Sequence, residues 1–146
     1  MVSAPGKNFL FVVGILYIVF AGIGLLVSAG GLLTADYWDS VFPTASGMSW
    51  SVYYQIAIVG SFFHVFVGIM GVVNRARLEK ASMLRVLACI DIAYVVFGAV
   101  LGSMVFAGAF GGFVAVFSLA VGLVLPILYF IGAQKNLAVY SDQYRQ

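Results

Sequence analysis

The chain has 146 residues, a length that fits one domain, and 64% of them are hydrophobic while 8% are charged. A soluble domain has about half apolar and about a quarter charged residues, so this composition and the mean hydropathy of +1.13 exclude a water-soluble globule. The net charge is +2, and no basic patch is interleaved with exposed aromatic residues, which argues against nucleic acid as a partner.

Four apolar segments follow along the chain, and each is long enough to cross a hydrocarbon core about 30 Å thick. We expect a first span over 8–33, an outer loop over 34–49, a second span over 50–73, a cytoplasmic turn over 74–81, a third span over 82–107, an outer turn over 108–111, a fourth span over 112–134 and a cytoplasmic tail over 135–146. The first segment is longer than the apolar part of a secretory signal, so it is expected to remain as a helix. The predicted fold class is all-α, a polytopic membrane protein with an up-down bundle of four transmembrane helices.

Small residues recur at helical spacing in all four spans and predict the faces through which the helices pack. The candidate packing residues are Gly14, Ala21, Gly24, Ser28, Gly60, Gly68, Gly98, Gly102, Ser118 and Gly122. In lipid, small side chains let two helix backbones approach closely, and that packing drives association. The alternative is compositional, because glycine is common throughout this chain. Pro126 is expected to kink the fourth span locally.

The outer loop holds two acidic residues, Asp36 and Asp39, and no basic residue. An aromatic cluster surrounds it, made up of Tyr37, Trp38, Phe42, Trp50, Tyr53 and Tyr54. Tryptophan and tyrosine favour the headgroup level of a membrane because their rings are amphipathic. We therefore expect an interfacial anchor here, with a short helical turn around residues 35–42. A docking surface or a lid is the alternative.

Residues 15–22 and 92–99 resemble one another, because ILYIVFAG and IAYVVFGA share Ile, Tyr, Val and Phe at corresponding positions. Such a match fits two parallel helical-hairpin repeats related by an axis along the membrane normal. In so restricted an alphabet, chance also produces matches of this kind. In this alignment Gly14 corresponds to Asp91, so the acidic residue would belong to one half alone.

The basic residues predict the orientation of the bundle. With four spans, all of them fall on one side: Lys7, Arg75, Arg77, Lys80, Arg85, Lys135 and Arg145. The opposite side carries Asp36 and Asp39 and no base. By the positive-inside rule, both termini are predicted to be cytoplasmic, in a multi-pass protein of the cell membrane.

A buried polar pair is expected between the second and third spans. His64, the single histidine, and Asp91 are equally distant from the charged turn between Arg75 and Lys80. In an antiparallel hairpin, equal spacing means equal depth, here about 13 Å below the helix ends at about 1.5 Å per residue. Glycines one turn to either side of His64 turn it toward a neighbouring helix. We therefore predict contact between the two side chains, directly or through one water.

Two interpretations of this pair remain open. An aspartate at the centre of a spanning helix costs roughly 2.5–3.5 kcal/mol, and a histidine partner offsets part of that cost through a charge-assisted hydrogen bond. Because histidine titrates near neutral pH, the pair is a candidate proton-linked site. The alternative is a structural contact that fixes the register of the two helices.

The sequence predicts neither a cofactor nor a metal nor a catalytic site. One histidine and one buried aspartate do not complete a zinc shell, and a bis-histidine haem would need a second copy of the chain. Ser61, three residues before His64, is a weak basis for nucleophilic catalysis. A single cysteine, Cys89, excludes an intrachain disulfide. We therefore expect no enzyme.

Three segments are similar to a known group of proteins: GILYIVF at 14–20, NRARLEKA at 74–81 and LPILYFIGAQKN at 125–136. Together they resemble the uncharacterised small four-helix integral membrane proteins of Gram-positive anaerobic bacteria. The resemblance covers most of the chain and rests on packing and topology motifs. It implies a bacterial inner membrane and the four-helix plan, and it implies no catalytic residue.

Two functions from different classes are expected. The first is a non-enzymatic integral membrane protein that acts through helix association, as a homo-oligomer or as an accessory subunit of a membrane complex. This function is suggested by the stripe of small residues on every span and by the short loops and tail, which leave little of the chain outside the membrane. The alternative is a small proton-coupled transporter or channel that uses His64 and Asp91. The expected partners are the lipid bilayer and either the protein itself or another membrane protein.

Overall fold

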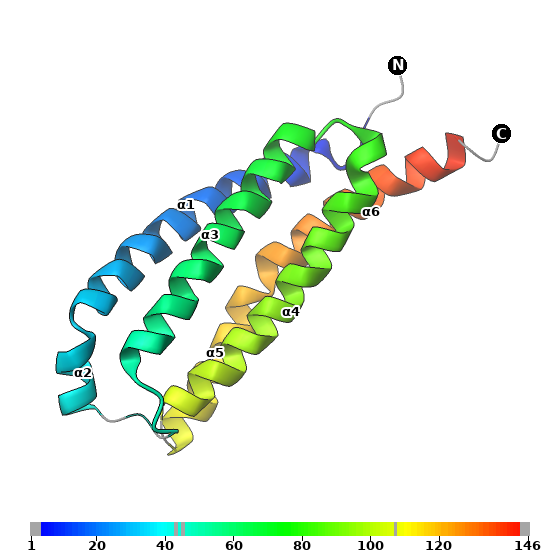
Figure 1. Ribbon diagram of the computed structural model, residues 1–146. Helices are drawn as coiled ribbons and strands as arrows, with labels where there is room; N and C mark the ends of the chain where they lie inside the picture. The colour runs from blue at the N-terminus through cyan, green and yellow to red at the C-terminus, as the bar shows by residue number, and fades with distance from the viewer. Residues whose placement is uncertain (1–3, 43, 45, 107, 144–146) are drawn as a thin grey trace.

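The computed structural model describes residues 4–42, 44, 46–106 and 108–143, and its regular elements are all helical. The order is α1 (Lys7–Leu33), α2 (Ala35–Val41), α3 (Trp50–Asn74), the short 3₁₀ helix η1 (Leu78–Lys80), α4 (Ala81–Val105), α5 (Gly108–Gly122) and α6 (Val124–Gln143) (Figure 1). The predicted all-α fold class is confirmed. Helices α1, α3 and α4 lie over the first three expected spans, and α2 lies where the short helical turn is expected.

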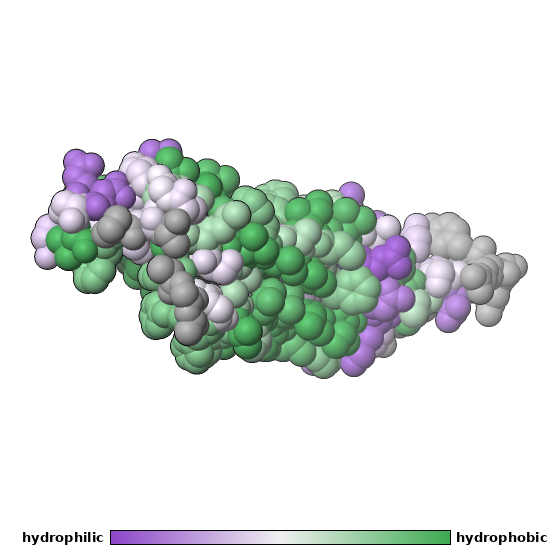
Figure 2. Space-filling view, turned by 90° about the horizontal axis from the view of Figure 1, so that it is seen from below, coloured by the Kyte–Doolittle hydropathy of each residue, from purple (hydrophilic) through white to green (hydrophobic). Residues whose placement is uncertain are grey.

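In the described part of the chain, four helices are long and apolar enough to cross a bilayer, namely Lys7–Leu33, Trp50–Asn74, Leu78–Val105 and the combined segment Phe110–Asp142. They run side by side along the length of the molecule (Figure 1). On the face in Figure 2, hydrophobic residues cover the middle and hydrophilic residues gather toward the two ends. The chain is therefore a multi-pass membrane protein built as a four-helix bundle.

The two ends of the bundle differ in composition. One end, called the basic end below, carries Lys7, Arg75, Arg77, Lys80, Arg85 and Lys135. The start of α1 lies there, near the α3–α4 connection, and α6 ends on the same side of the bundle (Figure 1). The opposite end, called the aromatic end, carries α2, the start of α3 and the junction of α4 with α5. Each half of the bundle is named below after its end.

The helices pack most closely in two pairs. Helix α1 packs most extensively on α3, and α4 on α5 and α6, while α3 and α4 meet less extensively. Gly14 and Gly68 make the α1–α3 contact possible, because a Cβ added at either glycine would come within 2.8 Å of the other's carbonyl oxygen. Backbones in such close contact are typical of helix association in lipid.

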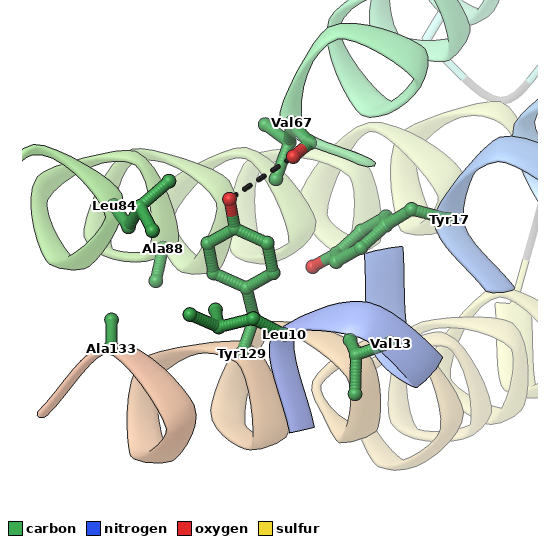
Figure 3. Close-up of a cluster of buried hydrophobic side chains, with 8 residues drawn as sticks. All are labelled: Leu10, Val13, Tyr17, Val67, Leu84, Ala88, Tyr129 and Ala133. Carbon is green, nitrogen blue, oxygen red and sulfur yellow. Dashed lines mark hydrogen bonds between the residues drawn. The ribbon is translucent and has the colours of Figure 1, made fainter. Parts of the chain in front are cut away.

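A cluster of buried side chains, called the core cluster below, fills the basic half. Its members are Leu10, Val13, Tyr17, Val67, Leu84, Ala88, Tyr129 and Ala133, which α1, α3, α4 and α6 contribute (Figure 3). The Tyr129 hydroxyl points across the bundle and donates to the Val67 carbonyl at 3.1 Å. The cluster therefore joins all four spans in this half.

The fourth span is interrupted where α5 ends and α6 begins, at Leu123. Pro126 lies in the first turn of α6 and is fully buried. A proline has no N–H to donate to the carbonyl four residues earlier, and its ring crowds that carbonyl, here that of Gly122. The interruption lies at the level where the sequence predicts a kink.

The predicted outer turn at 108–111 is wrong, because these residues form the first turn of α5. Phe106, which follows the last residue of α4, has an extended backbone. Gly111 serves close packing instead of a turn. A Cβ on it would lie 2.2 Å from the Phe106 carbonyl oxygen, so only glycine lets α5 begin against the end of α4.

Most of the predicted packing residues do lie between helices. Ala21 and Ser28 are buried, and Ser118 is half-buried. Gly60 lies against the Tyr94 ring, and Gly122 lies against Val95, where an added Cβ would come within 2.9 Å of the Val95 side chain. Contacts at Gly24 and Gly102 are looser, because an added Cβ would meet only Ser61 Oγ at 3.0 Å and Val114 at 3.4 Å, respectively.

Gly98 is the exception among these residues. It is exposed, and an added Cβ would meet nothing within 4 Å, so the prediction that Gly98 packs against a neighbouring helix of the bundle is wrong. It lines a groove of about 100 Å³ beside Tyr53, Ile56 and Tyr94. The physical reason is the Tyr94 ring, which lies between α3 and α4 and keeps their backbones apart at this level.

Candidate functional site

The Asp91 carboxylate is the centre of the candidate site and is fully buried in α4. The Tyr17 hydroxyl, from α1, donates a hydrogen bond to its Oδ2. His64 Nε2, from α3, lies 2.9 Å from its Oδ1. One carboxylate thus receives polar groups from two other spans, and the contact predicted between His64 and Asp91 is present.

The two contacts to the carboxylate differ in geometry. The His64–Asp91 approach is an ion-pair distance, but its angles fall outside those of a hydrogen bond. Among the described residues, neither His64 Nε2 nor Asp91 Oδ1 has a hydrogen-bond partner. A buried polar atom without a bond costs about 1–3 kcal/mol, so both atoms favour a further donor, a further acceptor or a shared proton.

Aromatic rings hold the imidazole in place. The His64 ring lies between Tyr17, at a centroid distance of 5.7 Å, and Tyr94, which meets it edge-on at 5.4 Å. The Tyr94 hydroxyl donates to the Ile56 carbonyl at 3.2 Å. Its ring fits against α3 because residue 60 is glycine, where a Cβ would lie only 1.6 Å from the Tyr94 oxygen.

A cavity of about 470 Å³ adjoins the site, and all four spans contribute to its lining. Tyr17, Ser61, His64 and Asp91 supply the polar groups, and the rest of the lining is apolar. The His64 side chain is 26% exposed while Asp91 is completely covered, so the imidazole is the more accessible partner. Val121 to Pro126, at the break between α5 and α6, close one wall. This space is called the central cavity below.

The central cavity extends from Asp91 toward the aromatic end. Ala21 and Gly24 in α1, and Val95 in α4, line it one and two turns beyond the carboxylate in that direction. On the other side, the core cluster fills the bundle, with the Tyr129 ring meeting Tyr17 edge-on at 5.9 Å. Asp91 therefore lies at the boundary between a packed half and a hollow half.

Tyr17 is the site residue that sequence reasoning missed. It lies between Gly14 and Ala21 at helical spacing, within the stripe of small residues on the first span. The sequence does indicate that Tyr17 and Asp91 lie at a similar depth in the membrane. Tyr17 is about 15 Å from Lys7 along its helix, and Asp91 is about 16 Å from Lys80 along its own. Which helix would present a side chain to Asp91 could not be read from the sequence.

A second missed residue lies at the basic end. Asn136 is fully buried, although it was expected in a polar tail. Its Oδ1 accepts the Gly6 N–H at 2.7 Å, and its Nδ2 donates to the Arg75 carbonyl at 3.0 Å. These groups lie at the start of α1 and the end of α3, where helix backbone atoms lack partners within their own helix.

The predicted aromatic residues gather far from Asp91. Trp50 is buried and has ring contacts with Tyr53, Tyr54 and Phe106, while Trp38 contacts Tyr37 and Phe42. Tyr37 and Phe42 are exposed. The cluster therefore has a packed part at the start of α3 and an exposed part on α2.

No group of three or more His, Cys, Asp or Glu side chains in the described part of the chain could hold a metal ion. Comparisons with protein-family models, with curated proteins and with solved structures gave no match.

The arrangement can couple a proton to helix packing. An ionised Asp91 is an acceptor only, and it accepts from the Tyr17 hydroxyl and lies at ion-pair distance from the His64 ring. A protonated Asp91 becomes a donor on one oxygen and no longer attracts a charged histidine. Adding or removing one proton therefore changes the contacts that join α1, α3 and α4.

Proposed function

We propose that this protein is a small proton-coupled transporter in which Asp91, His64 and Tyr17 form the proton-binding site. The observation that carries the proposal is a fully buried carboxylate, contacted from two other spans, beside a cavity of about 470 Å³ that all four spans line. No covalent chemistry, metal or cofactor is part of it.

Energetics favour function over a purely structural role. An aspartate at a helix centre costs roughly 2.5–3.5 kcal/mol, whereas polar contacts between helices in membranes contribute only about 0.6 kcal/mol on average. Two contacts of that size do not offset the cost. A buried carboxylate that is retained at such a cost is better explained by a proton or a ligand that it must bind.

The central cavity has the features of a transport site. It lies near the middle of the apolar spans, and the interrupted fourth span forms part of its wall. Secondary transporters commonly bind substrate at such a depth, beside broken helices. A substrate that occupied this cavity would lie against the imidazole and the carboxylate, so its binding and the proton's would affect each other.

The orientation belongs to the same proposal. By the positive-inside rule, the basic end is cytoplasmic, and the central cavity extends toward the outside. The resemblance to small four-helix proteins of Gram-positive anaerobic bacteria supports a bacterial inner membrane. Cysteines introduced as Ser40→Cys and Ser141→Cys, in a Cys89→Ala background, should react with an impermeant reagent from opposite sides of the membrane. Labelling of both from one side would contradict this orientation.

Transport is tested with purified protein in liposomes that contain a pH-sensitive dye. Proton movement is recorded under an imposed membrane potential, with and without organic ammonium, amino-acid and sugar probes. We expect proton movement in the wild type and its loss in Asp91→Asn, while Asp142→Asn, at an exposed aspartate of α6, behaves as wild type. Absence of proton movement in the wild type with every probe, or an active Asp91→Asn variant, would refute the proposal.

Association is the second candidate function. Gly30 and Gly98 are exposed, and an added Cβ at either would meet nothing within 4 Å, so both leave room for a helix of another molecule. A homo-oligomer or a subunit of a larger membrane complex would use such faces. The mass of the protein in detergent, compared with that of Gly30→Leu and Gly98→Leu, tests this. A monomer of unchanged size in all three would exclude a homo-oligomer that is formed through these faces.

A further inference from the structure

A second cavity, of about 480 Å³, lies at the aromatic end and is called the aromatic cavity below. Most of its lining is aromatic, and the lining residues are Trp38, Val41, Phe42, Trp50, Val105, Phe106 and Phe110. They come from α2, α3, α4, α5 and the segments that connect them. The cavity is therefore formed by tertiary packing around the interfacial helix, and it is separate from the central cavity, with which it shares no lining residue.

The rings around the aromatic cavity meet at varied angles. Trp50 and Phe106 have centroids 5.6 Å apart with planes at 70°, and Phe106 and Phe110 have centroids 5.5 Å apart with planes at 81°. On the other side, Trp38 and Phe42 lie 5.8 Å apart at 31°. Rings set at several angles around one space resemble the aromatic cages that hold quaternary ammonium groups through cation–π contacts.

Charge at this end has a single sign. Asp36 and Asp39 lie on α2, and the sequence has no lysine or arginine between Lys7 and Arg75. Asp39 adjoins the aromatic cavity, because its Oδ1 accepts the backbone N–H of Trp50 at 2.9 Å. An electrostatic field from two carboxylates attracts cations to the cavity and repels anions.

We propose that the aromatic cavity binds a monovalent organic cation with apolar substituents, of the quaternary ammonium or phosphonium class. A neutral apolar molecule gains little there, because the surrounding lipid is equally apolar. A cation gains from the aromatic rings and from the nearby Asp39 carboxylate, neither of which lipid tails provide. This site involves neither Asp91 nor His64, so it does not depend on the proposed transport function.

The binding test uses tetraphenylphosphonium and tetraphenylborate, two probes of nearly equal size and shape but opposite charge. Titration calorimetry is carried out with the full chain in an uncharged maltoside detergent, so that no lipid headgroup competes. We expect saturable binding of tetraphenylphosphonium and at least about tenfold weaker binding of tetraphenylborate. Trp38 and Trp50 are the only tryptophans and both line the cavity, so their fluorescence should change over the same concentration range.

Variants locate the site. Trp38→Leu and Phe110→Leu each remove one ring, and each should weaken tetraphenylphosphonium binding about tenfold. Asp36→Asn combined with Asp39→Asn removes both charges, retains an oxygen to accept the Trp50 N–H, and should weaken binding by a similar factor. Phe62→Leu is the matched control, because Phe62 is 61% exposed on α3 and lies outside the cavity lining. Helix content by circular dichroism shows which variants are folded.

Three outcomes would overturn the proposal. One is equal binding of the two probes, and another is binding that is unchanged in all the folded aromatic-end variants. The third is binding that Asp91→Asn abolishes while the aromatic-end variants retain it, which would assign the cation to the central cavity. If both proposals are correct, Asp91→Asn should abolish proton movement but leave cation binding intact. The transport proposal and the cation-binding proposal can therefore fail independently.

Discussion

The basic half and the aromatic half of the bundle are held together in different ways. In the basic half, the core cluster fills the space between the spans, and Asn136 joins the start of α1 to the end of α3. In the aromatic half, two partly open cavities of about 470 and 480 Å³ and a groove of about 100 Å³ lie beside the spans. The same helices therefore surround a larger buried core at one end, whereas at the other they pack around a smaller aromatic cluster and border open space.

This difference matters because lipid provides no hydrophobic drive to bring helices together. Association in a bilayer depends on close packing and on polar bonds between helices. The basic half has both, with arginine and lysine adding contacts over rings, as Arg75 does over Phe11 at 4.6 Å and Lys135 over Phe9 at 4.4 Å. We infer that the basic half is the fixed part and that any change of shape is concentrated in the aromatic half. Asp91 lies where the two meet.

The largest expected effect comes from forcing apart the close α1–α3 contact. In Gly68→Leu, the new side chain begins 2.7 Å from the Gly14 carbonyl oxygen, and backbone cannot move aside as a side chain can. We expect a loss of at least about 3 kcal/mol in the free energy of unfolding, or no folded protein. Unfolding in mixed detergent micelles measures it.

Gly98→Leu is the matched substitution in the aromatic half. A Cβ there meets nothing within 4 Å, so the free energy of unfolding should change by less than about 0.5 kcal/mol. Equal effects at positions 68 and 98 would show that the two halves are equally tight, contrary to the comparison drawn above.

A smaller but still large effect is expected at Asn136. Asn136→Leu keeps a side chain of similar size but removes the partners of the Gly6 N–H and the Arg75 carbonyl. The buried Gly6 N–H and the partly buried Arg75 carbonyl would lose their bonds, and because a fully buried group costs about 1–3 kcal/mol and a partly buried one less, we expect a loss of about 2–4 kcal/mol. Asn8→Leu, at an exposed asparagine two residues from Gly6, should cost little. A similar stability for both variants would show that Asn136 does not hold this end together.

Sequence reasoning reached the spans and the His64–Asp91 contact because both depend on quantities that a sequence contains. Apolar length gives a span, and equal spacing from a charged turn gives equal depth. The role of Asn136 could not be predicted, because a polar residue that follows an apolar segment looks like the start of a polar tail. Its burial depends on helix ends from distant parts of the chain.

Tyr17 and Gly98 have a similar explanation. The periodicity of α1 and α4 identifies a face but not the helix that covers it, nor the distance to that helix. Tyr17 meets Asp91 because its side chain reaches from α1 to α4, and Gly98 meets nothing because the Tyr94 ring lies between α3 and α4. Likewise, glycines before residue 113 favour a turn by composition, whereas Gly111 is required for close packing at the start of α5.

The next largest effect on the free energy of unfolding is expected at Asp91, which lies at the boundary between the two halves. Asp91→Ala and His64→Ala should each destabilise the bundle, because each leaves a polar partner buried. The double variant should cost less than the sum, by about 0.6–1.7 kcal/mol, the range measured for polar pairs in membranes. Unfolding of the four proteins in one detergent completes the cycle. Strict additivity would mean that the two side chains do not interact.

The smallest expected effect compares two tyrosines that make the same bond in different halves. Tyr129 donates to the Val67 carbonyl at 3.1 Å from a fully buried position, and Tyr94 donates to the Ile56 carbonyl at 3.2 Å from a partly exposed one. Both acceptors lie inside α3, where a carbonyl also accepts a helix N–H, so removing the hydroxyl leaves no carbonyl unpaired. We therefore expect Tyr129→Phe to cost about 0.6–1 kcal/mol and Tyr94→Phe less than about 0.5 kcal/mol. Measured under identical unfolding conditions, a larger loss for Tyr94→Phe would place the tighter α3 contacts in the aromatic half and reverse the inference about which half moves.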